Sequence, residues 1–115
     1  PEPPKFTRKF VSYKLVAAGE NVVLKAGFSG VPTPNVEWLK NGEPLNAKHI
    51  SVQTNNEDTS LVITKIQSSD EGEYSCRLSN LRGLDVCRCQ IELEKVREIK
   101  PIEEVTQTSK KAERK

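Results

Sequence analysis

The sequence contains no methionine, and it has a single histidine and a single tryptophan. No apolar run approaches the roughly 18–20 residues that a membrane-spanning helix needs. A dominant charge is lacking too, because 18 Lys and Arg residues face 16 Asp and Glu residues and leave a formal net charge of +2. So small an excess gives no electrostatic indication of nucleic acid or an anionic membrane as the partner.

Signatures of catalysis and of cofactor binding are missing as well. The six glycines are scattered, so no Gly-rich loop is available to cradle a phosphate. Paired carboxylates occur at Glu57-Asp58 and Glu103-Glu104. Both pairs fall in an expected loop or tail, where no apolar pocket would raise a pKa for acid–base work. We therefore expect no enzyme, no cofactor and no small-molecule substrate.

The sequence does have enough apolar material for one core. Val, Ile, Leu and Phe make up 25% of its 115 residues, above the roughly 20% below which chains tend to stay disordered. The length fits one domain of about 100–150 residues. Because the chain begins with Pro1 rather than Met, we expect it to be a segment of a longer protein.

Apolar residues recur with a period of two, which is typical of half-buried β-strands. Val22, Leu24, Ala26 and Phe28 share one face in this way. Turn-forming clusters separate the alternating runs, and Asn41-Gly42 is a strong hairpin signal. The pattern predicts an all-β, two-sheet sandwich. The expected strands cover residues 4–9, 10–17, 20–29, 35–40, 49–54, 59–66, 72–80 and 84–95.

The character of the chain changes after about residue 95. Seven Lys and Arg residues face four Asp and Glu residues over 95–115, with no aromatic residue and no strand alternation. We expect a domain over 1–95 and a charged linker over 96–115. A weak helical stripe through Ile102, Val105 and Ala112 leaves open a helix or a segment docked on a partner.

Several motifs in fixed order resemble the I-set immunoglobulin pattern over about residues 4–95. They are Val22-x-Leu24-x-Ala26, Gly30-x-Pro32-x-Pro34-x-Val36-x-Trp38-x-Lys40-Asn41-Gly42, Leu61-x-Ile63, Asp70-x-Gly72-x-Tyr74-x-Cys76 and Asn80-x-x-Gly83. The resemblance implies an immunoglobulin-like β-sandwich with Trp38 at its centre and Tyr74 in a tyrosine corner. The structural core residues it implies are Leu24, Ala26, Trp38, Leu61, Asp70, Gly72, Tyr74 and Cys76.

One position departs from the family pattern. Ala26 stands where the family has a cysteine, so the resemblance leaves Cys76 without its partner across the sandwich. Disulfides are rare in reducing compartments, and the sequence has no Asn-x-Ser/Thr glycosylation acceptor. Both features favour a cytoplasmic domain.

Cytoplasmic I-set domains are characteristic of giant muscle proteins such as titin, twitchin, projectin, stretchin, kettin and obscurin. The resemblance therefore implies a structural and interaction module of the sarcomere, one link of a tandem array that scaffolds thick or thin filaments. Two alternatives stay open. One is an extracellular adhesion or receptor immunoglobulin domain without its disulfide, and the other is a regulatory domain flanking a muscle-type kinase.

The three cysteines invite a metal or redox interpretation. Cys87 and Cys89 could bind a metal ion together with Cys76 and His49. Residues i and i+2 of a strand lie on one face but about 6.5–7 Å apart, so sharing an ion would require distortion. Burial as small apolar side chains explains the cysteines better. We expect no metal site, and a disulfide between Cys76 and either other cysteine stays open.

Basic residues gather in the first strands of the predicted sandwich. They are Lys5, Arg8, Lys9, Lys14 and Lys25. A basic stripe of this kind could contact an acidic filament, either actin or the myosin rod, and ordinary surface charge is the alternative. The expected partners are such filaments and neighbouring immunoglobulin or fibronectin type III domains, not nucleic acid or a membrane.

Overall fold

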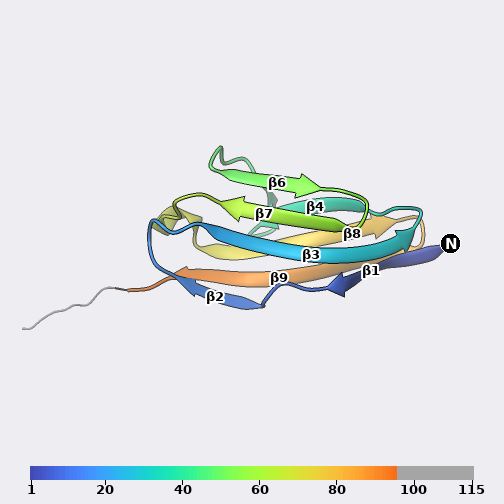
Figure 1. The fold of residues 1–115 in the computed structure, drawn as a ribbon, viewed down its shortest axis with the longest axis horizontal. Helices are drawn as coiled ribbons and strands as arrows, with labels where there is room; N and C mark the ends of the chain where they lie inside the picture. The colour runs from blue at the N-terminus through green and yellow to red at the C-terminus, as the bar shows by residue number, and fades with distance from the viewer. Residues whose placement is uncertain (96–115) are drawn as a thin grey trace, which may run out of the picture.

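The computed structural model describes residues 1–95 as two β-sheets packed face to face (Figure 1). The four-stranded sheet has the order β1-β3-β7-β6, and the five-stranded sheet has the order β2-β9-β8-β4-β5. The strands are β1 (Glu2–Arg8), β2 (Tyr13–Val16), β3 (Val22–Val31), β4 (Asn35–Lys40), β5 (Glu43–Pro44), β6 (Ile50–Thr54), β7 (Asp58–Ile63), β8 (Gly72–Asn80) and β9 (Gly83–Leu93). A 3₁₀ turn, η1 (Ser68–Asp70), precedes β8. The all-β sandwich expected from the sequence is confirmed.

The period-two pattern places one face of each central strand inside the sandwich. In β3, the alternating residues Val22, Leu24, Ala26 and Phe28 are buried. The strand pairs with β7 without a register shift, so that Leu24 lies opposite Leu61. The inward residues of both sheets form one apolar cluster, whose burial is the main driving force for folding.

The predicted second strand, 10–17, is too long at its start. Residues 9–12 carry the chain from the four-stranded sheet, where β1 pairs with β3, to the five-stranded sheet, where β2 pairs with β9 in parallel. Phe10 lies in this crossing and stacks on Trp38, with ring centroids 5.4 Å apart. The crossing therefore covers one side of the core with an aromatic ring.

The Asn41-Gly42 turn forms the tight hairpin that its sequence predicts. Both residues have positive φ, 53° and 82°, and they join β4 to β5 as a two-residue loop. This geometry matches the type I′ turn, whose twist fits antiparallel strands. The sequence did not indicate the two-residue strand β5 that follows, because Pro44 and the surrounding polar residues resemble a loop.

Trp38 joins the two sheets through a buried polar contact as well as through its size. It lies on β4, and its indole Nε1 donates a hydrogen bond to the Thr59 hydroxyl on β7 of the opposite sheet, at 2.8 Å. Thr59 is only 1% exposed, so this bond satisfies an indole N–H that has no access to water. Ala26 is buried in the same core, and all three cysteines are free.

The turn before β8 is held by Asp70 and Tyr74. The Tyr74 hydroxyl donates to the Asp70 carbonyl at 2.7 Å. The Asp70 carboxylate accepts the Gln67 backbone N–H at 2.9 Å and contacts His49 Nε2 at 2.7 Å. Burial, with the nearby Asp70 charge, raises the pKa of Tyr74 to about 12. The phenol therefore stays protonated, as a donor must. The predicted linker over 96–115 lies outside the described residues.

The two tyrosines of the chain offer a matched test of this corner. Tyr74→Phe removes a buried hydrogen bond and leaves the Asp70 carbonyl without its donor, so we expect a loss of about 1–3 kcal/mol in the free energy of unfolding. Tyr13→Phe removes an exposed bond to Glu92 and should cost less than about 0.5 kcal/mol. Urea unfolding measures both. Equal losses for the two variants would contradict the corner's structural role.

Candidate protein-binding surfaces

The structure brings three of the five predicted basic residues onto one surface. Lys5 on β1 and Lys25 on β3 point outward from the four-stranded sheet, since their strand neighbours Phe6, Leu24 and Ala26 point into the core. Arg8 follows a register shift in β1 and lies opposite Gly27, on the same outer face. We call Lys5, Arg8 and Lys25 the basic face. Lys9 lies in the crossing after β1, and Lys14 lies on β2 in the other sheet. The five residues therefore do not form a single stripe.

Within the basic face, Arg8 is already paired. Its guanidinium reaches over β3 and forms an ion pair with Asp58 on β7. The path crosses Gly27, where an added Cβ would lie 2.9 Å from the Arg8 Nη2 atom. A glycine at this position thus lets the arginine cross. Within residues 1–95, neither Lys5 nor Lys25 has an ion-pair partner, so these two ammonium groups carry the free positive charge of the face.

A polar groove of about 530 Å³ adjoins the basic face. It is lined by Lys25, Gln53, Thr54, Asn55, Asp58 and Ser60. Its lining offers hydrogen-bond donors and acceptors, with one positive charge at Lys25 and one negative charge at Asp58. It has little apolar surface to enclose a small molecule. The groove is better suited to side chains of a protein partner.

Lys14 and Lys9 lie beside thiols instead of on the basic face. Burial raises the pKa of Cys89, and the nearby Lys14 charge partly opposes this rise. Burial also raises the pKa of Cys87, and there the Lys9 charge acts in the opposite direction. Burial also raises the pKa of Cys76 to about 12. These thiols are protonated at neutral pH, and a protonated buried thiol is a poor nucleophile.

The register of β8 and β9 places the cysteines in a defined order. Cys76 lies directly opposite Cys87, whereas Cys89 lies opposite Tyr74. His49 is not beside them but contacts Asp70. Among residues 1–95, no group of three or more His, Cys, Asp or Glu side chains is arranged to hold a metal ion.

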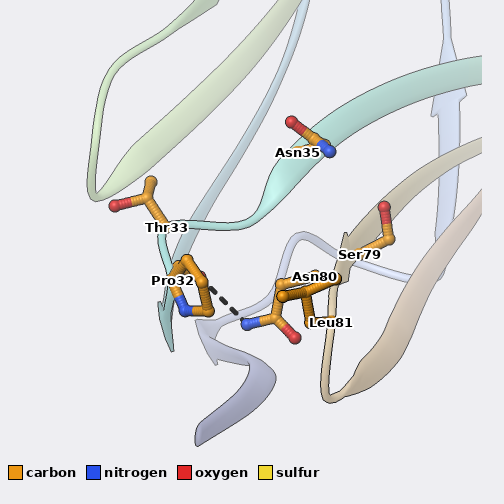
Figure 2. Close-up of a pocket in the computed structure, with 6 residues that line it drawn as sticks. All are labelled: Pro32, Thr33, Asn35, Ser79, Asn80 and Leu81. Carbon is orange, nitrogen blue, oxygen red and sulfur yellow. Dashed lines mark hydrogen bonds between the residues drawn. The ribbon is translucent and has the colours of Figure 1, made fainter. Parts of the chain in front are cut away.

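A hollow of about 340 Å³ lies at the end of the sandwich where the N-terminus sits (Figure 2). Asn80 organises it, because its Nδ2 donates to the Pro32 and Glu2 carbonyls, each at 2.9 Å. The neighbouring Leu81 is 91% exposed. An exposed apolar side chain such as Leu81, with polar groups around it, is suited to contact with a neighbouring protein.

The outer face of the five-stranded sheet was not singled out from the sequence. Leu39, Leu84 and Val86 line a groove of about 310 Å³ there, together with charged residues that include Arg77 and Arg88. Leu84 is 58% exposed. The signal was present, because the alternation that buries Cys87 and Cys89 requires Val86 and Arg88 to point outward.

With the fold and its surfaces described, comparison with known proteins decides the family. The family model for the Immunoglobulin I-set domain matches residues 4–93. The chain belongs to the immunoglobulin I-set family. Among the described residues, no helix is long and apolar enough to cross a membrane.

Several curated relatives of this I-set domain are muscle proteins. The "Titin homolog" of Caenorhabditis elegans is 36% identical over 98 residues, covering 81% of this chain and 0% of that protein to the nearest per cent. Smooth muscle myosin light chain kinase of Gallus gallus is 32% identical over 111 residues, which cover 93% of this chain and 6% of that kinase. Neural cell adhesion molecule 1-B of Xenopus laevis is 36% identical over 64 residues, which cover 56% of this chain and 6% of that protein. The chain thus spans only a small part of these relatives.

Solved structures of titin domains share the fold. The titin M3 domain superposes with a TM-score of 0.75 at 25% identity, covering 83% of this chain and 100% of that domain. A chain in a complex of titin M10 with an obscurin-like 1 immunoglobulin domain superposes with a TM-score of 0.74 at 29% identity, covering 82% and 96%. This I-set domain is therefore an immunoglobulin module of the muscle-protein type.

The buried thiols give a direct test of the described packing. We expect Cys76, Cys87 and Cys89 of the native chain to react with a thiol reagent such as DTNB on the order of a hundredfold or more slower than in urea, because reaction requires opening of the sandwich. Absorbance during titration at pH 8, with and without urea, measures this. Rapid native reaction of even one thiol would show that its strand is not packed as described.

Proposed function

We propose that this I-set domain is a structural and interaction link in a tandem array of a filament-associated sarcomeric protein, working in the cytoplasm. The observation that carries the proposal is the similarity to muscle-protein immunoglobulin domains, which extends over the whole sandwich. The role is mechanical and adhesive, without catalysis. The sandwich carries load along the array, and its exposed surfaces bind filaments or neighbouring domains.

The placement of the two ends supports a link in series. The N-terminus lies at one end of the sandwich, and β9 ends at the opposite end (Figure 1). A chain that enters at one pole and leaves at the other lets neighbouring domains follow in line. The exposed Leu81 and the Asn80 hollow lie at the entry pole, where a preceding immunoglobulin or fibronectin type III domain would make contact.

The absence of a cross-sheet disulfide supports the cytoplasm. Ala26 lies in the buried core, and the three cysteines are free. A reducing compartment keeps thiols in this state. The adhesion-molecule relative matches a shorter part of the chain, so an extracellular role is less well supported.

A regulatory domain beside a muscle-type kinase is the second candidate. The alignment with smooth muscle myosin light chain kinase covers 93% of this chain, more than the 81% aligned with the titin homolog. The sequence flanking the chain in its parent protein distinguishes the two, because a kinase catalytic domain carries Gly-rich-loop and HRD motifs.

For filament binding, we propose the basic face as the contact. Lys5 and Lys25 are exposed and free of ion pairs within residues 1–95, and the polar groove beside Lys25 offers hydrogen-bonding groups. Actin filaments and myosin rods present acidic surfaces, so such a face would meet either by charge attraction that weakens as salt rises.

Co-sedimentation with F-actin, and separately with myosin filaments, tests the proposal. We expect the chain to pellet with one of them, with affinity falling between 50 and 200 mM salt. The Lys5→Glu/Lys25→Glu variant should weaken binding by roughly tenfold. The control, Arg77→Glu/Arg88→Glu, makes the same change in net charge on the outer face of the other sheet and should bind within about twofold of wild type.

The outcomes separate the parts of the proposal. Loss of binding in the control alone would move the contact to the five-stranded sheet and overturn the basic face. Equal losses in both variants would show that only net charge matters. Absence of pelleting with either filament would remove filament binding from the function and leave a spacer between neighbouring domains.

A further inference from the structure

The two sheets have four edge strands, and three of them carry features that discourage pairing with another strand. β1 (Glu2–Arg8) contains Pro3 and Pro4 and two register shifts. β2 has only four residues, with Lys14 pointing toward the core side. β5 has two residues, one of them Pro44. Prolines, bulges, short length and inward charges are the usual means by which edges avoid new partners.

The fourth edge strand, β6, has none of these features. Its sequence, Ile50–Thr54, contains no proline and no charged residue, and its register with β7 is regular along its whole length. β6 is the outermost strand at the top of the sandwich in Figure 1. Four of its five residues are exposed, and Val52 at its centre is 41% exposed.

The hydrogen bonds at the two ends of β6 show which backbone groups face outward. The His49 carbonyl accepts from the Thr64 N–H at 3.0 Å, and the Asn55 N–H donates to the Asp58 carbonyl at 2.9 Å. Because backbone groups of an antiparallel strand alternate in direction, Ser51 and Gln53 also face β7. Ile50, Val52 and Thr54 therefore direct their backbone groups to the open side.

Most of these outward groups have no partner within residues 1–95. The Ile50 N–H is bonded to the Ala47 carbonyl at 3.3 Å. The five groups that remain available are the Ile50 carbonyl and the N–H and carbonyl of both Val52 and Thr54. They are spaced as the next strand of a sheet would require.

We propose that this edge pairs with β6 of a second copy of the chain, in antiparallel orientation, with Val52 on the two-fold axis. In this register Val52 faces Val52 of the second copy, and Ile50 faces Thr54. The two valines exchange a pair of N–H···O bonds, and each Thr54 N–H donates to the Ile50 carbonyl across the axis. Four of the five available groups are used in this pattern. The Thr54 carbonyl is the fifth, and it would face the Ile50 N–H of the second copy, which is bonded to the Ala47 carbonyl within its own chain.

Side chains agree with a second copy as the occupant. The two Val52 side chains meet on one face and bury each other's exposed surface, while neutral Ser51 and Gln53 meet on the other face. Beyond the strand ends, this register brings the turn that carries Lys48 in one copy toward the bend at Asn56 and Glu57 in the other. Lys48 and Glu57 are both exposed, so opposite charges approach at each end of the paired strands.

The interface is small compared with the roughly 1,200–2,000 Å² of stable complexes. The association is therefore weak between free molecules and effective where copies are held side by side, because tethering raises the local concentration. The pairing uses neither Lys5 nor Lys25, but Gln53 and Thr54 of β6 also line the polar groove beside Lys25. Such pairing would join two arrays laterally.

A single cysteine on the axis tests the register in the full chain. In a hydrogen-bonded antiparallel pair the Cα atoms lie about 5.5 Å apart, within the disulfide range of about 4.4–6.8 Å. Under mild oxidation with oxygen and copper phenanthroline, Val52→Cys should form covalent dimers at least about fivefold faster than Val23→Cys. Val23 is a suitable control because it is 53% exposed on the outer surface of the same sheet. Equal rates for the two variants would overturn the proposal.

A charge exchange tests the same interface without a covalent bond. Sedimentation equilibrium of the full chain up to millimolar concentration should show a monomer–dimer equilibrium. Lys48→Glu and Glu57→Lys should each weaken it by about threefold or more, and the double variant should return it to within about twofold of wild type. A chain that stays monomeric, or a double variant no tighter than the single variants, would overturn the proposal.

Discussion

The structure depends on one contact that joins its two sheets, the hydrogen bond from the Trp38 indole on β4 to the Thr59 hydroxyl on β7. In most immunoglobulin domains a disulfide also links the sheets. Here Ala26 is buried and the cysteines are free, so non-covalent packing carries the load. Trp38 supplies the largest apolar side chain, Phe10 covers it, and Thr59 satisfies its buried N–H.

The sandwich separates its tasks by location. The N-terminus lies at one end of the sandwich and β9 ends at the other, so the two ends suit contact with neighbouring domains. Its faces present the exposed charges of Lys5 and Lys25 on one sheet and the Leu39, Leu84 and Val86 groove on the other. Its edges are closed to new strands except at β6. Each kind of surface can thus take a different protein partner without disturbing the core.

The sequence was sufficient for what depends on local pattern. Alternation located the strands and Asn41-Gly42 located the hairpin, while the resemblance to the I-set pattern located the corner at Tyr74. Features that depend on pairing between distant strands could not be predicted from the sequence pattern. The split of Lys9 and Lys14 from the basic face follows from the chain crossing between sheets. The Arg8–Asp58 pair and the open edge of β6 follow from strand order, which no local pattern records.

The most direct measurement of the central claim is the free energy of unfolding of Thr59→Val by urea denaturation, with reductant present throughout. Valine keeps the shape of threonine but leaves the Trp38 N–H buried without an acceptor. We predict a loss of about 1–3 kcal/mol, with a smaller loss for Thr54→Val, which removes only the hydroxyl that contacts Thr59 from the exposed edge strand. A Thr59→Val variant as stable as wild type would contradict the account, because the sheets would then be held together without this contact.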